Sequence, residues 1–140
     1  MRGAEKKAFS EAFYSRQTIL KELGEEGQEK LAKAKIAIVG TGGLGSVSSL
    51  YLALAGVGYI RLIDQDTVEA HNLHRQILYS TDDVHYPKAE IAAKRLQKLN
   101  PLIEVEAVSE NVHASNVERL LQDVDCVVDG LDNMITRYLV

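Results

Sequence analysis

Short apolar runs alternate along this chain with stretches of helical periodicity. The runs at 36–39 and 126–128 are continuous, as in strands that are buried on both faces of a parallel sheet. Residues 59–63 form a further apolar strand, and residues 103–108 alternate as in a half-exposed strand. Helical spacing occupies the segments between them, most clearly over 87–99. The alternation predicts an α/β fold with a Rossmann-like, mostly parallel sheet and helices on both faces.

Polar residues with helical spacing dominate the segment before the first strand. A helix ending at Gly24 and a second, shorter helix after it are expected there. We therefore divide the chain into an N-terminal helical segment, 1–34, and a Rossmann-like domain, 35–140. The chain stops a few residues into an amphipathic helix that begins at Asp132, with no Gly or Pro stop signal. We expect a truncated chain, with the second domain incomplete at its C-terminus.

Three glycines follow the first predicted strand in the pattern Gly40-x-Gly42-x-x-Gly45 and open a helix. The first glycine permits a tight turn, the second lets the backbone approach a phosphate, and the third lets helix pack against strand. The helix N-terminus offers free N–H groups to the anion. Asp64 ends the next strand, where an acidic side chain accepts hydrogen bonds from ribose hydroxyls. The pattern predicts a nucleotide site without choosing between NAD and ATP.

The segment 64–86 is long for a connection between a strand and a helix, which usually takes about 2–6 residues. A short helix is expected within it at 75–79. Arg75, and Lys88 just after the segment, can neutralise phosphate oxygens, and Asn72 can donate its amide to one. A dehydrogenase needs apolar room for nicotinamide beyond the ribose and has no use for these groups. The segment therefore favours a triphosphate, ATP, as the ligand.

Six segments of the chain resemble motifs of the ThiF/MoeB family, the adenylating domain shared with ubiquitin-activating enzymes. The resemblance covers about residues 10–140 and follows the family order. Its carriers are Ser15-Arg16-Gln17, Gly40-Thr41-Gly42-Gly43-Leu44-Gly45-Ser46, Asp64-Gln65-Asp66-Thr67-Val68, Asn72-Leu73-His74-Arg75-Gln76, Pro87-Lys88 and Leu131-Asp132-Asn133.

The resemblance implies ATP-dependent adenylation of the C-terminal carboxylate of a ubiquitin-like or sulfur-carrier protein, with release of pyrophosphate. A carboxylate is ionised at pH 7, so this adenylyltransferase needs no general base, in agreement with the absence of a convincing catalytic histidine. Many family members also carry Cys-x-x-Cys pairs that hold zinc and a downstream reactive cysteine. Neither is present here, so zinc is expected only in a part of the protein beyond this chain, and the short chain alone is not expected to activate a carrier fully.

The resemblance also assigns roles to residues. Arg16 matches an arginine that family dimers insert into the partner's nucleotide site, which implies a homodimer. Asp132 matches the aspartate associated with magnesium, and Asp66 either contributes to the site directly or only caps the turn after its strand. The implied catalytic residues are Arg16, Arg75, Lys88 and Asp132, with Asp132 at the metal. The implied ATP-binding residues are Gly40, Gly42, Gly43, Leu44, Gly45, Asp64, Asp66, Asn72, Arg75, Gln76 and Lys88.

Each assignment has a purely structural alternative. Arg16 and Lys88 are by default solvated surface charges, and Asp132 is by default a helix N-cap. Cys126 lies in an apolar run and is expected in the core. Three functional alternatives also stay open: a non-catalytic nucleotide-binding or dimerisation module, an NAD-dependent oxidoreductase, and adenylation of a modified tRNA base.

The composition narrows the classes of partner. With 46% hydrophobic and 26% charged residues, the sequence is typical of a soluble globular domain. Its formal net charge of −4 provides no basic field, so neither nucleic acid nor an anionic membrane surface is an expected partner. No apolar run approaches the length of a membrane span. The single cysteine excludes an internal disulfide and fits a reducing, cytoplasmic setting.

Overall fold

Four parallel strands form a single sheet in the computed structural model, which describes residues 3–140. Residues 1 and 2, part of the N-terminal segment expected over 1–34, lie outside the description. The strand order is β3-β2-β1-β4, which is the beginning of the doubly wound Rossmann order. The predicted α/β fold with a parallel sheet is therefore confirmed. The strands are β1 (Lys35–Val39), β2 (Tyr59–Ile63), β3 (Glu104–Val108) and β4 (Cys126–Asp129).

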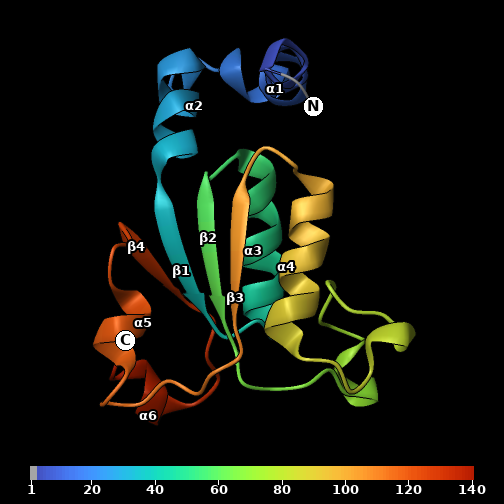
Figure 1. Ribbon diagram of the computed structural model, residues 1–140, viewed down its shortest axis with the longest axis vertical. Coiled ribbons are helices and arrows are strands. Elements are labelled where there is room, and N and C mark those ends of the chain that lie inside the picture. Colours follow the sequence, from blue (N-terminus) through green and yellow to red (C-terminus); the bar gives the residue numbers. More distant parts are fainter. Residues whose placement is uncertain (1–2) are drawn as a thin grey trace.

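Helices cover both faces of this sheet, and two more lie beyond the amino ends of the strands (Figure 1). α3 and α4 pack side by side on one face, and α5 packs on the other. α1 and α2 lie at the amino-terminal end, above the sheet in Figure 1. The α-helices are α1 (Gly3–Thr18), α2 (Gly24–Lys33), α3 (Gly43–Ala55), α4 (Lys88–Leu99), α5 (Val117–Leu121) and α6 (Met134–Arg137).

Alternate residues of the central strands divide the core into two clusters. Ile38, Ile60 and Leu62 are fully buried against α3 and α4. Ala37 and Val39 point to the opposite face, where they meet Leu120 of α5. Each large aliphatic side chain buried in this way stabilises the fold by about 1.5–3 kcal/mol. The two clusters hold the carboxyl ends of β1 and β2 in fixed positions. The loops after these strands therefore start from fixed points.

The long connection between β2 and α4 differs from the prediction. Residues 75–79 form turns rather than a helix, and two 3-10 helices flank them instead, Ala70–Asn72 and Thr81–Asp83. Asn72 accepts a hydrogen bond from the Glu69 backbone N–H, and Asp83 accepts one from that of Ser80. These side chains close short turns locally, which competes with helix formation.

Cys126 is exposed, and its predicted burial in the core is wrong. β4 is an edge strand that pairs only with β1, and its residues are exposed or half-buried. A continuous apolar run cannot distinguish a central strand from an edge strand, because the difference depends on which strands pair. The prediction of a strand at 126–128 is confirmed, whereas its complete burial is not.

Candidate functional site

A cavity of about 640 Å³ opens at the carboxyl ends of the strands, between the glycine turn and the loops after β2, β3 and β4. Its volume is in the range of small-molecule sites, about 300–1,000 Å³. In Figure 1 this is the lower end of the sheet, opposite α1 and α2. The cavity brings together most of the predicted site residues: Gly40, Gly42, Gly43, Leu44, Asp64, Asp66, Arg75, Gln76, Lys88 and Asp132.

The glycine turn has the geometry that its sequence predicts. Gly40 has a φ of +87°, and a Cβ there would lie 2.9 Å from the Gly130 carbonyl oxygen. At Gly45, which does not line the cavity, a Cβ would lie 1.8 Å from the Gly40 carbonyl oxygen, so helix and turn touch through backbone. At Gly42 the nearest atom is 3.6 Å away, in Gln76. Gly42 is also the N-cap of α3 and supplies no side-chain cap. The first N–H groups of α3 therefore stay available to an anion.

Asp64 is held in one orientation by three hydrogen bonds. Its Oδ2 accepts from the backbone N–H of Thr41 at 2.7 Å and from the Thr41 hydroxyl at 2.8 Å. Its Oδ1 accepts from the backbone N–H of Asp66 at 2.8 Å. A carboxylate offers about four lone-pair positions, so Oδ1 keeps one for a further donor. That donor can come from a molecule in the cavity, which Asp64 lines.

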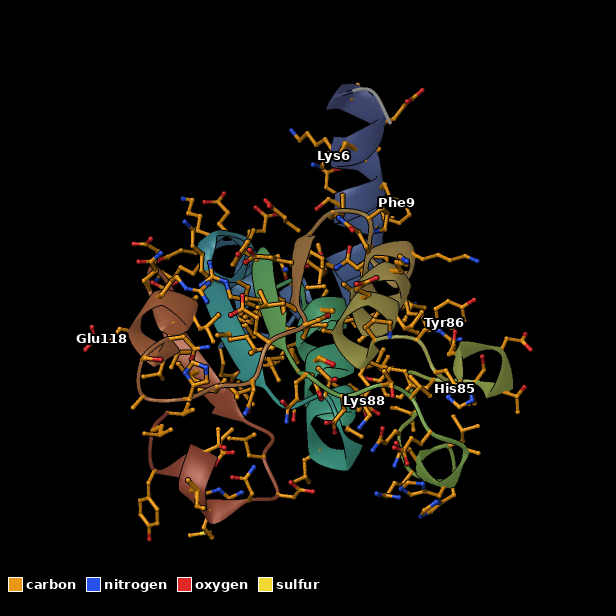
Figure 2. All side chains as sticks on the ribbon, turned by 60° about the horizontal axis from the view of Figure 1, so that its bottom comes forward. Lys6, Phe9, His85, Tyr86, Lys88 and Glu118 are labelled. Carbon is orange, nitrogen blue, oxygen red and sulfur yellow. The ribbon has the colours of Figure 1, made fainter. Side chains whose placement is uncertain are left out.

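Lys88 is buried, so the structural alternative of a solvated surface lysine does not hold. Its Nζ lies 3.1 Å from Oδ2 of Asp66, whose side chain is 59% exposed. A buried ammonium needs such a partner, because an unpaired one would be costly to desolvate. Asp66 therefore does more than cap a turn: it holds the Lys88 charge at the cavity wall. Figure 2 shows Lys88 close to the sheet, with His85 and Tyr86 farther out.

Arg75 and Gln76 line the cavity beside the glycine turn in different ways. Arg75 is exposed, and its Nη1 donates to the His71 carbonyl at 3.2 Å. Most of its guanidinium N–H groups thus stay available to an anion. Gln76 is buried, and its Oε1 has no hydrogen-bond partner within the part of the chain that the structure describes. Buried polar atoms are nearly always paired, so a ligand or a water molecule is expected to supply this bond.

Asp132 follows β4 and presents an exposed carboxylate to the cavity. The N-cap of α6 is Asn133, whose Oδ1 accepts from the Thr136 backbone N–H at 2.8 Å, so the alternative of Asp132 as the cap is wrong. No group of three or more His, Cys, Asp or Glu residues able to hold a metal occurs within residues 3–140. A metal at Asp132 would therefore need further ligands from a bound nucleotide.

Besides Gly45, two further predicted residues do not line the cavity. Asn72 is buried, and its Oδ1 accepts from the Glu69 N–H within its own 3-10 helix. Arg16 is exposed on α1, at the opposite end of the sheet. A role for Arg16 in a nucleotide site would require a second copy of the chain.

Several cavity residues escaped the sequence reasoning. Glu110, Asn111 and Val112 enter from the loop after β3, and Gly130 enters directly after β4. A Cβ on Gly130 would lie 2.6 Å from the Gly40 carbonyl oxygen. The Asp-Gly pair at the end of the last strand was the available signal for Gly130. The loop after β3 carried no comparable signal.

Comparison with known proteins gives consistent results. A model of the ThiF family matches residues 14–140. The sulfur carrier protein adenylyltransferase of Thermus thermophilus is 51% identical over 127 residues, which cover 91% of this chain and 47% of that protein. The SAMP-activating enzyme E1 of Haloferax volcanii is 47% identical over 126 residues, with 90% and 47% coverage. The chain thus spans about half the length of these curated relatives.

Solved structures of ATP complexes share the fold. The E. coli tRNA N6-threonylcarbamoyladenosine dehydratase bound to ATP superposes with a TM-score of 0.86 at 33% identity, over 93% of this chain and 54% of that one. E. coli MccB with ATP gives a TM-score of 0.72 at 38% identity, over 76% and 32%. Together with the match over residues 14–140, the parallel sheet and the glycine turn, these similarities show that the chain belongs to the ThiF family.

Proposed function

We propose that this chain is the ATP-binding part of an adenylyltransferase that activates the C-terminal carboxylate of a ubiquitin-like or sulfur-carrier protein. The observation that carries the proposal is the cavity, in which a glycine turn, a fixed carboxylate and two cations converge, Arg75 from the loop after β2 and Lys88 from the start of α4. The names of the relatives from Thermus thermophilus and Haloferax volcanii support the same reaction class.

The geometry supports one orientation of ATP. The phosphates lie over Gly42 and the N-terminus of α3, where no side chain blocks the backbone. The ribose lies at Asp64, whose Oδ1 can accept from a hydroxyl. Arg75 and Lys88 then lie on the phosphate side, as a planar fork and a point charge respectively.

The reaction in this orientation is displacement at the α-phosphorus. An oxygen of the carrier's carboxylate forms the new bond to phosphorus, the bond to the bridging oxygen breaks, and its electron pair leaves with pyrophosphate. Arg75 and Lys88 stabilise the charge that moves onto the leaving oxygens and align the reacting groups. No proton needs to be removed from the nucleophile, since a carboxylate is already ionised at pH 7.

Asp132 fits a magnesium ion that arrives with the nucleotide. Magnesium in nucleotide sites is commonly held by one or two carboxylates together with phosphate oxygens, and Asp132 presents an unpaired carboxylate to the cavity. When bound there, magnesium would neutralise phosphate charge. Zinc is not proposed for this chain, because its single cysteine cannot form a Cys-x-x-Cys pair.

We also propose that the active form is a homodimer in which Arg16 of one copy completes the site of the other. Arg16 is exposed on α1 and does not line the cavity of its own chain. Leu44, Val47 and Tyr51 form an exposed apolar stripe along α3, and Leu44 also lines the cavity. A second copy docked on this stripe would lie next to the nucleotide.

A second candidate substrate is a modified base of tRNA. The similarity to the E. coli tRNA N6-threonylcarbamoyladenosine dehydratase favours it, with a TM-score of 0.86. The higher identities, 51% and 47%, belong to the relatives named for sulfur-carrier adenylation and SAMP activation, so we favour a carrier protein. The charged groups on the cavity wall, among them Asp132 and Lys88, argue against a nicotinamide site.

No helix within residues 3–140 has both the length and the apolar character needed to cross a membrane. We place the protein in the cytoplasm, because a single cysteine and ATP chemistry suit a reducing compartment.

The test is ATP–pyrophosphate exchange with magnesium, using a carrier protein that ends in Gly-Gly and, separately, a tRNA that carries the modified base. We expect exchange that depends on the carrier and falls at least tenfold in Asp132→Ala and Arg75→Ala. Asp82→Ala is the matched control, because Asp82 is also an exposed aspartate but does not line the cavity. If the chain alone gives no exchange, its binding of ATP is measured by calorimetry with the same variants. Unchanged ATP binding in Arg75→Ala, or tight binding of NADH without binding of ATP, would overturn the proposal.

A further inference from the structure

Tyr79 reaches from the polar segment after β2 into the base of the glycine turn. Its ring is only 6% exposed, and its hydroxyl lies 2.9 Å from both the carbonyl oxygen and the hydroxyl oxygen of Thr41. Thr41 is completely buried. Neither residue was assigned a role by the sequence patterns, and neither lines the cavity. Tyr79 nevertheless hydrogen-bonds Thr41, and Thr41 hydrogen-bonds Asp64, which does line the cavity.

The hydrogen bonds of this cluster have a defined direction. The Thr41 hydroxyl donates its single proton to Oδ2 of Asp64, at 2.8 Å. The Thr41 hydroxyl oxygen and carbonyl oxygen then both act as acceptors toward Tyr79, whose single hydroxyl proton is shared between them in a bifurcated hydrogen bond. The order is therefore Tyr79 to Thr41 to Asp64. Because Tyr79 donates to the Thr41 hydroxyl oxygen, it favours the rotamer in which the threonine proton points toward the aspartate.

Burial and the neighbouring carboxylates keep Tyr79 in its donor form. Desolvation raises the pKa of the phenol far above its ordinary value, the hydrogen bond with Thr41 lowers it in part, and the nearby Asp64 and Asp66 raise it further. The hydroxyl is therefore protonated at neutral pH. Tyr79 therefore acts as a hydrogen-bond donor to Thr41 at the base of the glycine turn.

We propose that Tyr79 is a positioning residue that acts through Thr41 to fix the Asp64 carboxylate for the ribose hydroxyls of a bound nucleotide. With Oδ2 held by Thr41 and Oδ1 accepting from Asp66, the carboxylate is fixed where Asp64 lines the cavity, and Oδ1 keeps an acceptor position for a ribose hydroxyl. Loss of the Tyr79 hydroxyl frees Thr41 to rotate its proton away, and Asp64 loses this restraint. The inference rests on the proposed nucleotide site, and it concerns recognition of the ribose rather than of the phosphates.

The test compares three nucleotides, ATP, 2′-deoxy-ATP and 3′-deoxy-ATP, by isothermal calorimetry on the full chain. Tyr79→Phe should weaken ATP binding about threefold to tenfold, the range of one hydrogen bond. Its effect should shrink below about twofold for the deoxynucleotide that lacks the hydroxyl contacted by Asp64. Tyr14→Phe is the matched control, because Tyr14 is a second buried tyrosine whose hydroxyl is hydrogen-bonded, 2.8 Å from Asn100 Nδ2. It should leave all three affinities unchanged.

Three further variants separate the inference from the proposed function. Asp64→Asn should weaken the binding of ATP more than that of one deoxynucleotide; if it weakens all three nucleotides equally, or none, the proposed ribose site itself is wrong. Thr41→Val removes the hydroxyl at nearly constant shape and should reproduce Tyr79→Phe, which keeps the test valid if that variant unfolds. Thr41→Ser should behave as the wild type. Suppose that Asp64→Asn weakens ATP more than one deoxynucleotide, while Tyr79→Phe weakens all three nucleotides equally, or none. Tyr79 then has no positioning role and the inference fails.

Discussion

Replacing Gly45 with alanine tests how closely α3 approaches β1. A Cβ at this position would lie 1.8 Å from the carbonyl oxygen of Gly40 and 3.7 Å from the side chain of Ile38. Contacts below 3.0 Å to backbone do not occur, so the helix or the turn must move by more than an ångström. Overpacking costs about 1–3 kcal/mol where side chains can yield. Here the obstacle is backbone at the start of the nucleotide site, so we expect a loss of about 3 kcal/mol or more, a large part of typical domain stability.

Urea denaturation followed by far-UV circular dichroism measures this loss as the free energy of unfolding. Gly43→Ala is the matched control, since it lies two residues away in the same helix and its Cβ would meet nothing closer than Arg75 at 3.7 Å. Alanine is the better helix former, so Gly43→Ala should be as stable as the wild type or more so. The close-packing argument fails if Gly45→Ala loses less than about 1 kcal/mol at an unchanged slope of the urea transition.

Three further predictions concern other parts of the fold. Gly42→Ala should keep wild-type stability, because its Cβ meets only Gln76 at 3.6 Å. It should nevertheless weaken ATP binding at least tenfold in calorimetry. Equal affinities of variant and wild type would show that the phosphates do not bind at this glycine. Burial would raise the pKa of Asp83, but hydrogen bonds from Ser80 and the charge of Arg95 outweigh it and lower the pKa. The stabilisation by the ionised Asp83 carboxylate is present above the ordinary pKa of 3.8 and is lost as the pH falls through the lowered pKa of the folded state. Asp83→Asn should therefore reduce the melting temperature at pH 7 far more than at pH 3. A difference in melting temperature that does not change with pH contradicts this. Cys126 should react with one equivalent of Ellman's reagent in the folded protein, and a reaction that requires urea would restore the buried assignment.

Local sequence signals were sufficient where the structure is decided locally. The glycine turn and the strand 59–63 were predicted correctly because turn chemistry and hydrophobic periodicity act over a few residues. Cys126 was predicted wrongly because its burial depends on strand order, which no local pattern encodes. Lys88 shows the same limit of local patterns, because its local sequence is that of an exposed lysine whereas its side chain is buried. Its burial follows from the Asp66 carboxylate 22 residues earlier in the chain, and only the fold brings that partner within 3.1 Å.

The position of the cavity follows from the order of the strands. β2 and β3 extend the sheet on one side of β1, whereas the chain returns to the other side for β4. The strand order thus reverses between β1 and β4, and the loops that follow these two strands lead away in opposite directions. Such a topological switch point is where α/β sheets bind ligands. Gly40 and Gly130 meet there, with the Gly130 N–H bonded to the Val39 carbonyl at 2.9 Å. This contact brings Asp132 to the glycine turn, although 92 residues separate it from Gly40. The sequence associated these two residues only through the family resemblance; the sheet topology supplies the physical reason.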